Sequence, residues 1–176
     1  MNINTMEFTS KKMKHAFFNE PKQILVCNHC VPFLDVLWFH FILNVAKITH
    51  FIYVGHCFGY ENSWIRPIRS PQFIEKETRH LHSLDRCCSV IFPSGGKIKW
   101  KSGFFYLAKN TKIPLYIARL NYSNKKIEIL ERISLADDNL EDVKSHIITT
   151  LRTGRSPTLW WMYVLKWFGY GDESNF

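Results

Sequence analysis

The chain has 176 residues, of which 46% are hydrophobic, 22% charged and 15% aromatic, a composition that excludes an intrinsically disordered protein. Lysine and arginine exceed aspartate and glutamate by 23 − 15 = 8, which favours an anionic partner such as nucleic acid, lipid head groups or a phosphorylated substrate. The five cysteines are odd in number and include the adjacent Cys87 and Cys88, which argues against a disulfide framework and for a reducing compartment.

No segment of the sequence has the pattern of a signal peptide or a membrane span. Residues 1–22 are polar and rich in lysine, so we expect no signal peptide there. The most apolar stretch, 33–48, is interrupted by Asp35 and three other polar residues and is too short to cross a bilayer. If the protein meets a membrane, we therefore expect it to lie on the surface, facing the cytoplasm or another reducing compartment.

Strands and helices alternate along the chain. In order, the sequence predicts a buried strand over 23–27, a helix over 32–47, a strand over 50–54, an extended piece over 65–69, a helix over 73–86, a buried strand over 89–92 and a helix over 104–109. Strands over 114–121 and 125–133 follow, and then a last helix, capped by Asp138 or Asn139, that runs to 151. This alternation predicts a single α/β domain over 1–156, with a mixed, largely parallel sheet flanked by helices.

The aromatic segment 157–176 is distinct from this domain. Its aromatic and aliphatic residues fall at helical spacing on one face, at Trp160, Tyr163, Val164, Trp167 and Phe168. One interpretation is a helix that closes the core. The other is an interfacial helix in contact with a membrane, because Trp and Tyr favour the head-group layer.

Asn28, His29 and Asp35 are the first candidates for chemistry, because they follow the end of a predicted strand, where open α/β sheets bind ligands. A histidine with a carboxylate nearby can act as a general base, while the carboxylate fixes the imidazole tautomer and stabilises the imidazolium. The alternative is a structural histidine held in a loop and an Asp35 stabilised by the dipole of the next helix.

A glycine turn after the strand over 89–92 is the second candidate. It contains Ser94, Gly95 and Gly96, followed by Lys97. The glycines let backbone N–H groups approach an anion closely, and the lysine adds a positive charge. An ordinary glycine turn beside a solvated lysine is the alternative.

Arg66 and Arg69 supply two further cations on the extended piece before the helix over 73–86. Arginine binds phosphate through two parallel hydrogen bonds, which makes either residue a candidate phosphate ligand. Salt bridges to Glu75 or Glu77 in the following helix are the alternative.

Taken together, these segments resemble the motifs of the glycerolipid acyltransferases, the family of glycerol-3-phosphate and lysophosphatidate acyltransferases. The matching pieces, in order, are Asn28-His29 with Asp35, the extended piece from Ile65 to Arg69, the turn from Phe92 to Lys97 and the apolar strand from Ile113-Pro114 onward. The resemblance covers about residues 22–132.

The chain departs from the family pattern in three places. Five residues rather than four separate His29 from Asp35. Ser94 and Gly96 stand where the family usually has Glu and Thr, and Lys97 stands in place of its Arg. A Pro-Ser-Gly-Gly turn followed by a basic residue is similar to that of the plant plastid glycerol-3-phosphate branch, which favours glycerol-3-phosphate as the acceptor.

The resemblance implies an acyltransferase-like fold and direct transfer of an acyl group from acyl-CoA or acyl carrier protein to a hydroxyl of glycerol-3-phosphate or a lysophospholipid. His29 is then the general base and Asp35 its partner. The residues that hold the acceptor phosphate are Arg69, Ser94, Gly95, Gly96 and Lys97. The resemblance implies no metal, no cofactor beyond the acyl thioester co-substrate, and a membrane surface as partner.

Three other functions remain open at this stage. A non-catalytic lipid-binding protein of the same fold is one, because the spacing between His29 and Asp35 is altered. A thioredoxin-like redox site at Cys27 and Cys30 is the second, since the pair follows a strand and precedes a helix. A nucleic-acid partner is the third, but it is supported by charge alone, and we expect none.

Zinc binding has weaker support. Plausible ligands lie at Cys27, His29, Cys30, His56 and Cys57. No second Cys-x-x-Cys or His-x-x-x-His pattern completes a strong zinc motif, so we expect no metal site.

Overall fold

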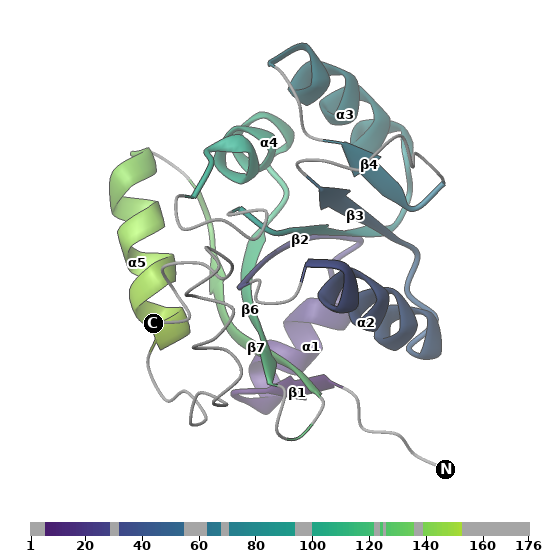
Figure 1. The fold of residues 1–176 in the computed structure, drawn as a ribbon, viewed down its shortest axis with the longest axis vertical. Helices are drawn as coiled ribbons and strands as arrows, with labels where there is room; N and C mark the ends of the chain where they lie inside the picture. The colour runs from purple at the N-terminus through teal and green to yellow at the C-terminus, as the bar shows by residue number, and fades with distance from the viewer. Residues whose placement is uncertain are drawn as a thin grey trace.

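A computed structural model describes residues 6–28, 32–54, 63–67, 71–93, 100–121, 124, 126–135 and 139–152. In chain order they form β1 (Met6–Phe8), α1 (Lys11–Asn19), β2 (Lys22–Cys27), α2 (Pro32–Val45), β3 (His50–Val54), β4 (Ile65–Pro67), α3 (Pro71–Ser83), β5 (Cys87–Ile91), α4 (Gly103–Thr111), β6 (Leu115–Asn121), β7 (Lys126–Ile133) and α5 (Leu140–Arg152). The described residues thus form one α/β domain (Figure 1).

The seven described strands form one sheet in the order β1-β7-β6-β2-β5-β3-β4. The five strands β6, β2, β5, β3 and β4 are parallel to one another. β7 runs antiparallel to β6, with an irregularity in register between Ile117 and Ala118, and β1 runs parallel to β7. The expectation of a mixed, largely parallel sheet is confirmed.

The central strands are mostly apolar because helices cover both faces of the sheet. In β2, Ile24 and Val26 pack into the core on one face, and Leu25 and Cys27 pack into the core on the other. The same alternation continues in β5 and β6, as expected from the two-residue period of a strand.

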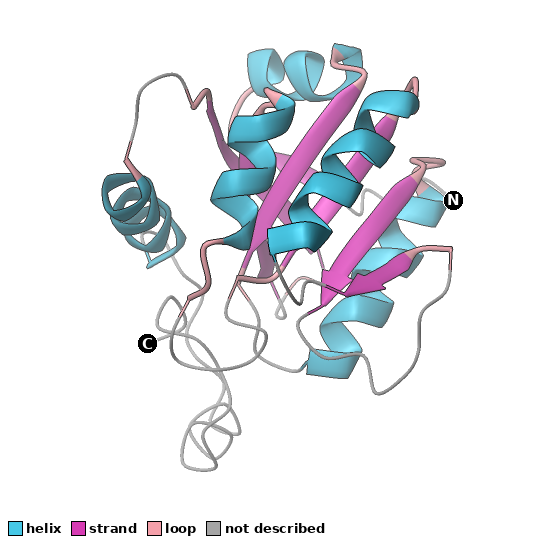
Figure 2. Cartoon of the chain, turned by 90° about the horizontal axis from the view of Figure 1, so that it is seen from above, coloured by secondary structure: helices cyan, strands magenta, loops and turns pink. Residues whose placement is uncertain are grey.

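The helices form a layer on each side of the sheet (Figures 1 and 2). The core on one face contains residues of α1 and α2, and the core on the other contains residues of α3, α4 and α5. The connection from β2 to β3 crosses the sheet in one direction, and those from β4 to β5 and from β5 to β6 cross in the other. Because such crossovers are right-handed, their helices lie on opposite faces.

The observed helix ends have local causes. Asn139 accepts a hydrogen bond from the backbone N–H of Asp142 (2.9 Å), so Asn139 is the N-cap of α5. The sequence predicted either Asp138 or Asn139 for this role. α2 ends at Val45, two residues before the predicted end, and Lys47 adopts a left-handed φ of 56°. None of the described helices is long and apolar enough to cross a membrane.

The strand β1 and the helix α1 were not predicted from the sequence. In α1, Phe17 is buried, whereas the three lysines are exposed, so the apolar signal was weak. Ser10 caps this helix by accepting a hydrogen bond from the backbone N–H of Met13 (3.1 Å). The segment 157–176 lies outside the described residues, so both interpretations of the aromatic tail stay predictions.

A pair of histidines lies where α2 ends and β3 begins. His50 Nδ1 lies 2.9 Å from the carbonyl oxygen of Ile48, so Nδ1 carries the proton and Nε2 accepts from Nδ1 of His40 at 2.8 Å. The ring of His40 stacks on Trp64, with 3.8 Å between the centroids. Burial lowers the pKa of His50 and the charge of His40 adds to this effect, while the hydrogen bond to Ile48 opposes it.

We expect the pair to make the free energy of unfolding depend on pH. The folded pKa of His50 is lower than its ordinary value of 6.5, so only the unfolded chain takes up a proton as the pH first falls below 6.5. The contribution of neutral His50 to the free energy of unfolding is therefore complete above pH 6.5. It is lost as the pH falls from 6.5 toward the lowered pKa of the folded state. Urea unfolding between about pH 7.5 and about pH 5.5 should show a smaller loss in His50→Gln than in wild type.

The exposed His82 provides the control for this measurement. His82→Gln should lose as much stability as the wild type over the same range. An identical pH dependence in wild type and His50→Gln would show that another group controls acid stability.

Candidate functional site

The carboxyl ends of the parallel strands lie side by side along one edge of the sheet. Val26 of β2 pairs with Ile91 at the end of β5, and Tyr53 of β3 pairs with Ile91 on its other side. Val54 pairs with Pro67 at the end of β4. The chain segments that follow β2, β5 and β4, which contain three of the four sequence motifs, therefore leave the sheet at the same edge, those of β2 and β5 from neighbouring strands.

The sheet has a topological switch point between β2 and β5. The two strands are neighbours, yet the helix that follows β2, α2, lies on one face and the helix that follows β5, α4, lies on the other. Connections that diverge in this way leave a crevice outside the strand ends, and open α/β proteins bind their ligands there. The Asn28-His29 segment follows one of these strands, and the Pro93–Lys97 segment follows the other.

Asn28 extends the pairing of β2 with β6 by one position. The backbone ladder ends where Cys27 pairs with Ala118, and the Asn28 side-chain oxygen then accepts a hydrogen bond from the backbone N–H of Leu120 (3.1 Å). Asn28 is buried, and its oxygen also accepts from the Cys27 thiol at 3.6 Å. The side chain therefore fixes the point at which the chain leaves the sheet, immediately before His29.

Asp35 is completely buried, at 0% exposure, although it lies in the first turn of a helix. The buried positions of α2 include Val36, Phe39, Ile42 and Leu43, so Asp35 lies on the face that packs on the sheet. A carboxylate in such a place requires compensating partners, because desolvation of an unpaired charge is costly.

The Pro93–Lys101 segment is closed at its base. The backbone N–H of Lys101 donates to the carbonyl oxygen of Pro93 at 2.9 Å, which joins the end of β5 to the residues that precede α4. Trp100 is buried at this closure and contacts Phe104 edge to face, with 6.1 Å between the ring centroids. Its indole N–H is buried without a hydrogen-bond partner in the described part of the chain.

Of the predicted site residues, only Asp35 lies among those described. The others, His29, Arg69, Ser94, Gly95, Gly96 and Lys97, lie outside them. The strand or helix that flanks each of them is described, so the order of their attachment points along the sheet edge is known.

Arg66 forms a buried ion pair, which was the alternative to a phosphate-binding role. Its Nε and Nη2 donate to Glu77 at 2.6 and 2.7 Å, and the hydroxyl of Tyr53 donates to the same carboxylate at 3.0 Å. The side chain of Glu77 is 1% exposed and that of Arg66 21%. Burial raises the pKa of Tyr53, and the charge of Glu77 adds to it. This network joins β3 and β4 to α3.

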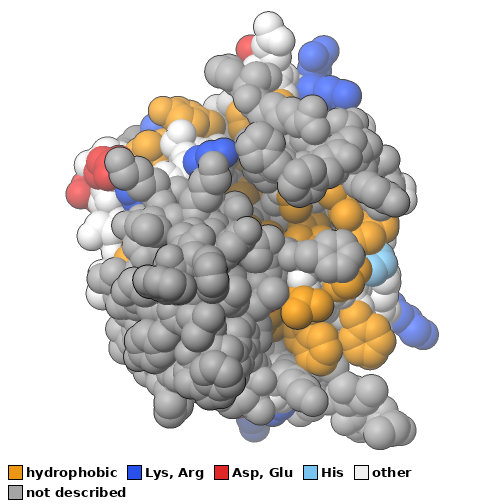
Figure 3. Space-filling view, viewed as in Figure 1, with side chains coloured by type: hydrophobic (Ala, Val, Ile, Leu, Met, Phe, Trp, Pro, Cys, Tyr) orange, Lys and Arg blue, Asp and Glu red, His pale blue; other side chains and the backbone are white. Residues whose placement is uncertain are grey.

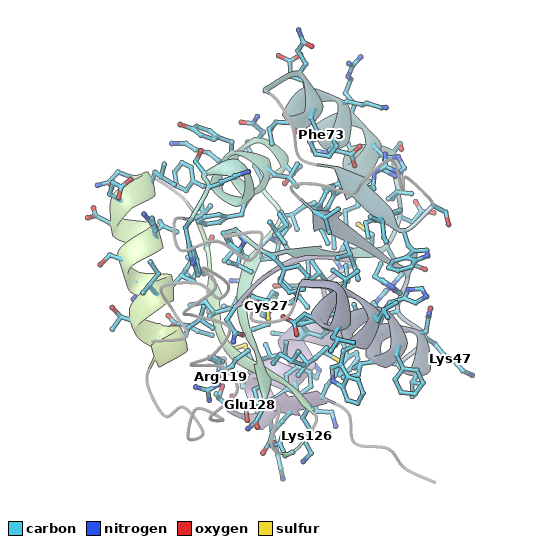
Figure 4. The ribbon with its side chains drawn as sticks, viewed as in Figure 1. Cys27, Lys47, Phe73, Arg119, Lys126 and Glu128 are labelled. Atoms are coloured by element: carbon cyan, nitrogen blue, oxygen red, sulfur yellow. The ribbon has the colours of Figure 1, made fainter. Side chains whose placement is uncertain are left out.

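Arg119 is a second arginine near the carboxyl edge, and sequence analysis did not identify it. Its Nη2 lies 2.6 Å from Glu128 on the antiparallel strand β7, and the two residues are adjacent in Figure 4. Asn121 donates to the same carboxylate at 2.6 Å, and Arg119 Nη1 donates to the carbonyl oxygen of Leu151 in α5 at 3.4 Å. Arg119 therefore joins α5 to the sheet.

An open cavity of about 230 Å³ lies at the opposite edge of the sheet. Its lining includes Phe17, Ala46 and Lys47 from the ends of α1 and α2, and Gln23 and Cys87 from the starts of strands. Helix carboxyl ends carry partial negative charge, and ligands of open α/β sheets bind at the other edge. Position therefore makes this cavity a poorer candidate for an anion site than the switch point.

Cys27 is an unfavourable position for redox chemistry. It is fully buried at the end of β2, in the interior of the molecule (Figure 4). A reactive thiol requires exposure and a lowered pKa. Cys30 lies outside the described residues, and so do His56 and Cys57. Within the described ranges, no group of three or more His, Cys, Asp or Glu side chains could hold a metal ion.

Comparisons with protein-family models, with curated proteins and with solved structures found no match.

Proposed function

We propose that the protein is an O-acyltransferase that moves an acyl group from a thioester donor to a hydroxyl of glycerol-3-phosphate or a lysophospholipid. One observation supports this proposal most strongly. The Asn28-His29 segment and the Pro93–Lys97 segment follow the neighbouring parallel strands β2 and β5, which flank the topological switch point, and the Ile65–Arg69 motif begins in β4 of the same sheet. Residues far apart in sequence are attached at one edge.

In this proposal His29 is the general base. It takes the proton of the acceptor hydroxyl, and the oxygen attacks the thioester carbonyl carbon. A new C–O ester bond forms and the C–S bond breaks. The departing thiolate then takes the proton from the imidazolium of His29, so that the enzyme returns to its starting state.

Asp35 would orient His29 and stabilise its charged form. Its complete burial on the sheet-facing side of α2 supports this role, because a buried carboxylate needs a hydrogen-bonding or cationic partner. Asn28 would help to position His29, because its side chain accepts a hydrogen bond from Leu120 of β6 and so fixes the end of β2 directly before His29.

The phosphate of the acceptor would be held by Arg69 and Lys97 together with Ser94 and the amides of Gly95 and Gly96. The described arginines close to this edge, Arg66 and Arg119, are engaged in ion pairs with Glu77 and Glu128. In this proposal phosphate binding therefore falls to Arg69 and Lys97.

Lys97→Ala and Arg69→Ala should raise the KM for the phosphorylated acceptor by about 10- to 100-fold, because hydrogen bonds to charged groups contribute about 1.5–3 kcal/mol. The KM for the acyl donor should change much less. Steady-state kinetics with each substrate varied in turn measures the two effects separately.

Lys101→Ala is the matched control, because Lys101 is an exposed lysine of the same segment outside the motif. It should leave both KM values unchanged. Equal increases for donor and acceptor in Lys97→Ala would contradict a specific phosphate site.

A further inference from the structure

The outward face of α2 is mostly apolar, although Asn44 is also exposed on this helix. We define the α2 surface as Leu34, Leu37, Trp38, Phe41 and Val45. Four of these are exposed, Leu34 by 60%, Leu37 by 40%, Phe41 by 52% and Val45 by 43%. The rings of Trp38 and Phe41 lie 6.2 Å apart. Spacings of three and four residues place the side chains in one stripe along the helix. Hydrophobic side chains gather over α2 in Figure 3.

Exposed large hydrophobic residues are concentrated on this side of the molecule. Six are exposed in the described part of the chain, and five of them belong to α1 and α2, including Phe18 of α1. The sixth, Tyr106, lies on α4, on the other side of the sheet. A contiguous apolar patch of this kind marks an interaction surface, whereas single exposed residues do not.

The exposed charges on the described residues of α1 and α2, and on Lys47 just after α2, are of one sign. α1 lies in the same helix layer and has exposed lysines at positions 11, 12 and 14, and Lys47 is exposed just after the end of α2. Neither helix has an exposed carboxylate, since α1 has no acidic residue and Asp35 of α2 is buried. On the opposite side, α3 and α5 carry mixed charges.

We propose that the α2 surface and the lysines of α1 together bind a membrane that contains anionic lipids. An apolar helix face inserts at the boundary of head groups and acyl chains, and each nearby lysine is attracted to anionic lipid. A protein partner would be expected to meet a surface of mixed charge, which the described residues of α1 and α2 do not form. Leu34 adjoins Asp35, so the docked membrane would lie beside the site. Only this last consequence depends on the proposed acyl transfer.

The test is sedimentation of the full chain with vesicles of phosphatidylcholine, with and without about 30% phosphatidylglycerol. We expect the wild type to bind the anionic vesicles. The double variant Leu37→Ser/Phe41→Ser should bind about 10- to 100-fold more weakly, because it removes two half-exposed apolar side chains from the inserted face. Lys11→Glu/Lys14→Glu should lose the preference for anionic lipid.

Two matched controls separate this surface from the rest of the molecule. Tyr106→Ser removes an equally exposed aromatic residue from the other side, and Lys76→Glu reverses an exposed lysine on α3. Both should bind like wild type. No acyl donor is present, so the result is independent of catalysis.

Several results would overturn the proposal. The first is equal binding by the double variant and the wild type. The second is loss of binding on deletion of 157–176 while the double variant binds normally, which would move the contact to the tail. The third is a wild type that ignores vesicles and instead forms a dimer that the double variant cannot form.

Discussion

His29→Ala should lower acyl transfer by about 10²–10⁴-fold while the protein remains folded, because a positioned general base contributes an effect of this size. The alanine variant cannot accept the proton of the acceptor hydroxyl, so the attacking oxygen remains a weak nucleophile. The measurement is the rate of labelled ester formation at saturating donor and acceptor. Circular dichroism and urea unfolding establish that the variant is folded.

Asp35→Asn should also reduce transfer, because an amide cannot stabilise the imidazolium that forms during the reaction. His82→Ala is the control for both variants, since it removes an exposed histidine of α3. It should retain full activity. Turnover of His29→Ala at the wild-type rate would exclude His29 as the base, and full activity of Asp35→Asn would leave Asp35 with a structural role only.

The second large effect is on stability. Glu77→Ala should lower the free energy of unfolding by about 3 kcal/mol, at the lower end of the range for breaking a buried ion pair, because Arg66 keeps 21% of its side chain exposed. The variant removes the buried carboxylate to which both Arg66 and Tyr53 donate. Urea unfolding followed by circular dichroism measures the change.

Glu75→Ala provides a matched control on the same helix, because Glu75 is exposed. Its effect should stay within about 0.5 kcal/mol. Arg66→Met/Glu77→Met should be more stable than Glu77→Ala, since exchanging both charges for apolar groups leaves no unpaired charge. If Glu77→Ala is as stable as Glu75→Ala, the buried network contributes little to the fold.

The sheet could be predicted from the sequence because its central strands are local apolar runs. The residues Ile24 to Cys27 and Val90 to Ile91 are buried on both faces, and such burial leaves a continuous hydrophobic signal. The helix α1 could not be predicted in the same way. Phe17 is its single buried residue, and the exposed lysines around it leave no periodic hydrophobic pattern. Its contacts with the sheet are also long-range, so no local sequence pattern reports them.

The candidate site could be predicted only in part. The sequence indicated the residue types and the strand ends, but it could not fix which face of α2 Asp35 occupies. It also could not decide between a phosphate-binding role and a salt bridge for Arg66, because that choice depends on how α3 docks against β4. The hydrogen bond from Leu120 to Asn28 joins positions 92 residues apart, and no local pattern encodes it.

The central claim is acyl transfer, and the most direct measurement is incubation of the purified full chain with labelled acyl-CoA and a panel of acceptors. The panel should contain glycerol-3-phosphate, lysophosphatidate and a lysophospholipid with a larger head group, and the products are separated by chromatography. We predict a labelled ester of at least one phosphorylated acceptor in wild type, reduced by about 10²–10⁴-fold in His29→Ala. Absence of ester from every acceptor, with acyl-CoA or acyl carrier protein as donor, would contradict the proposed function.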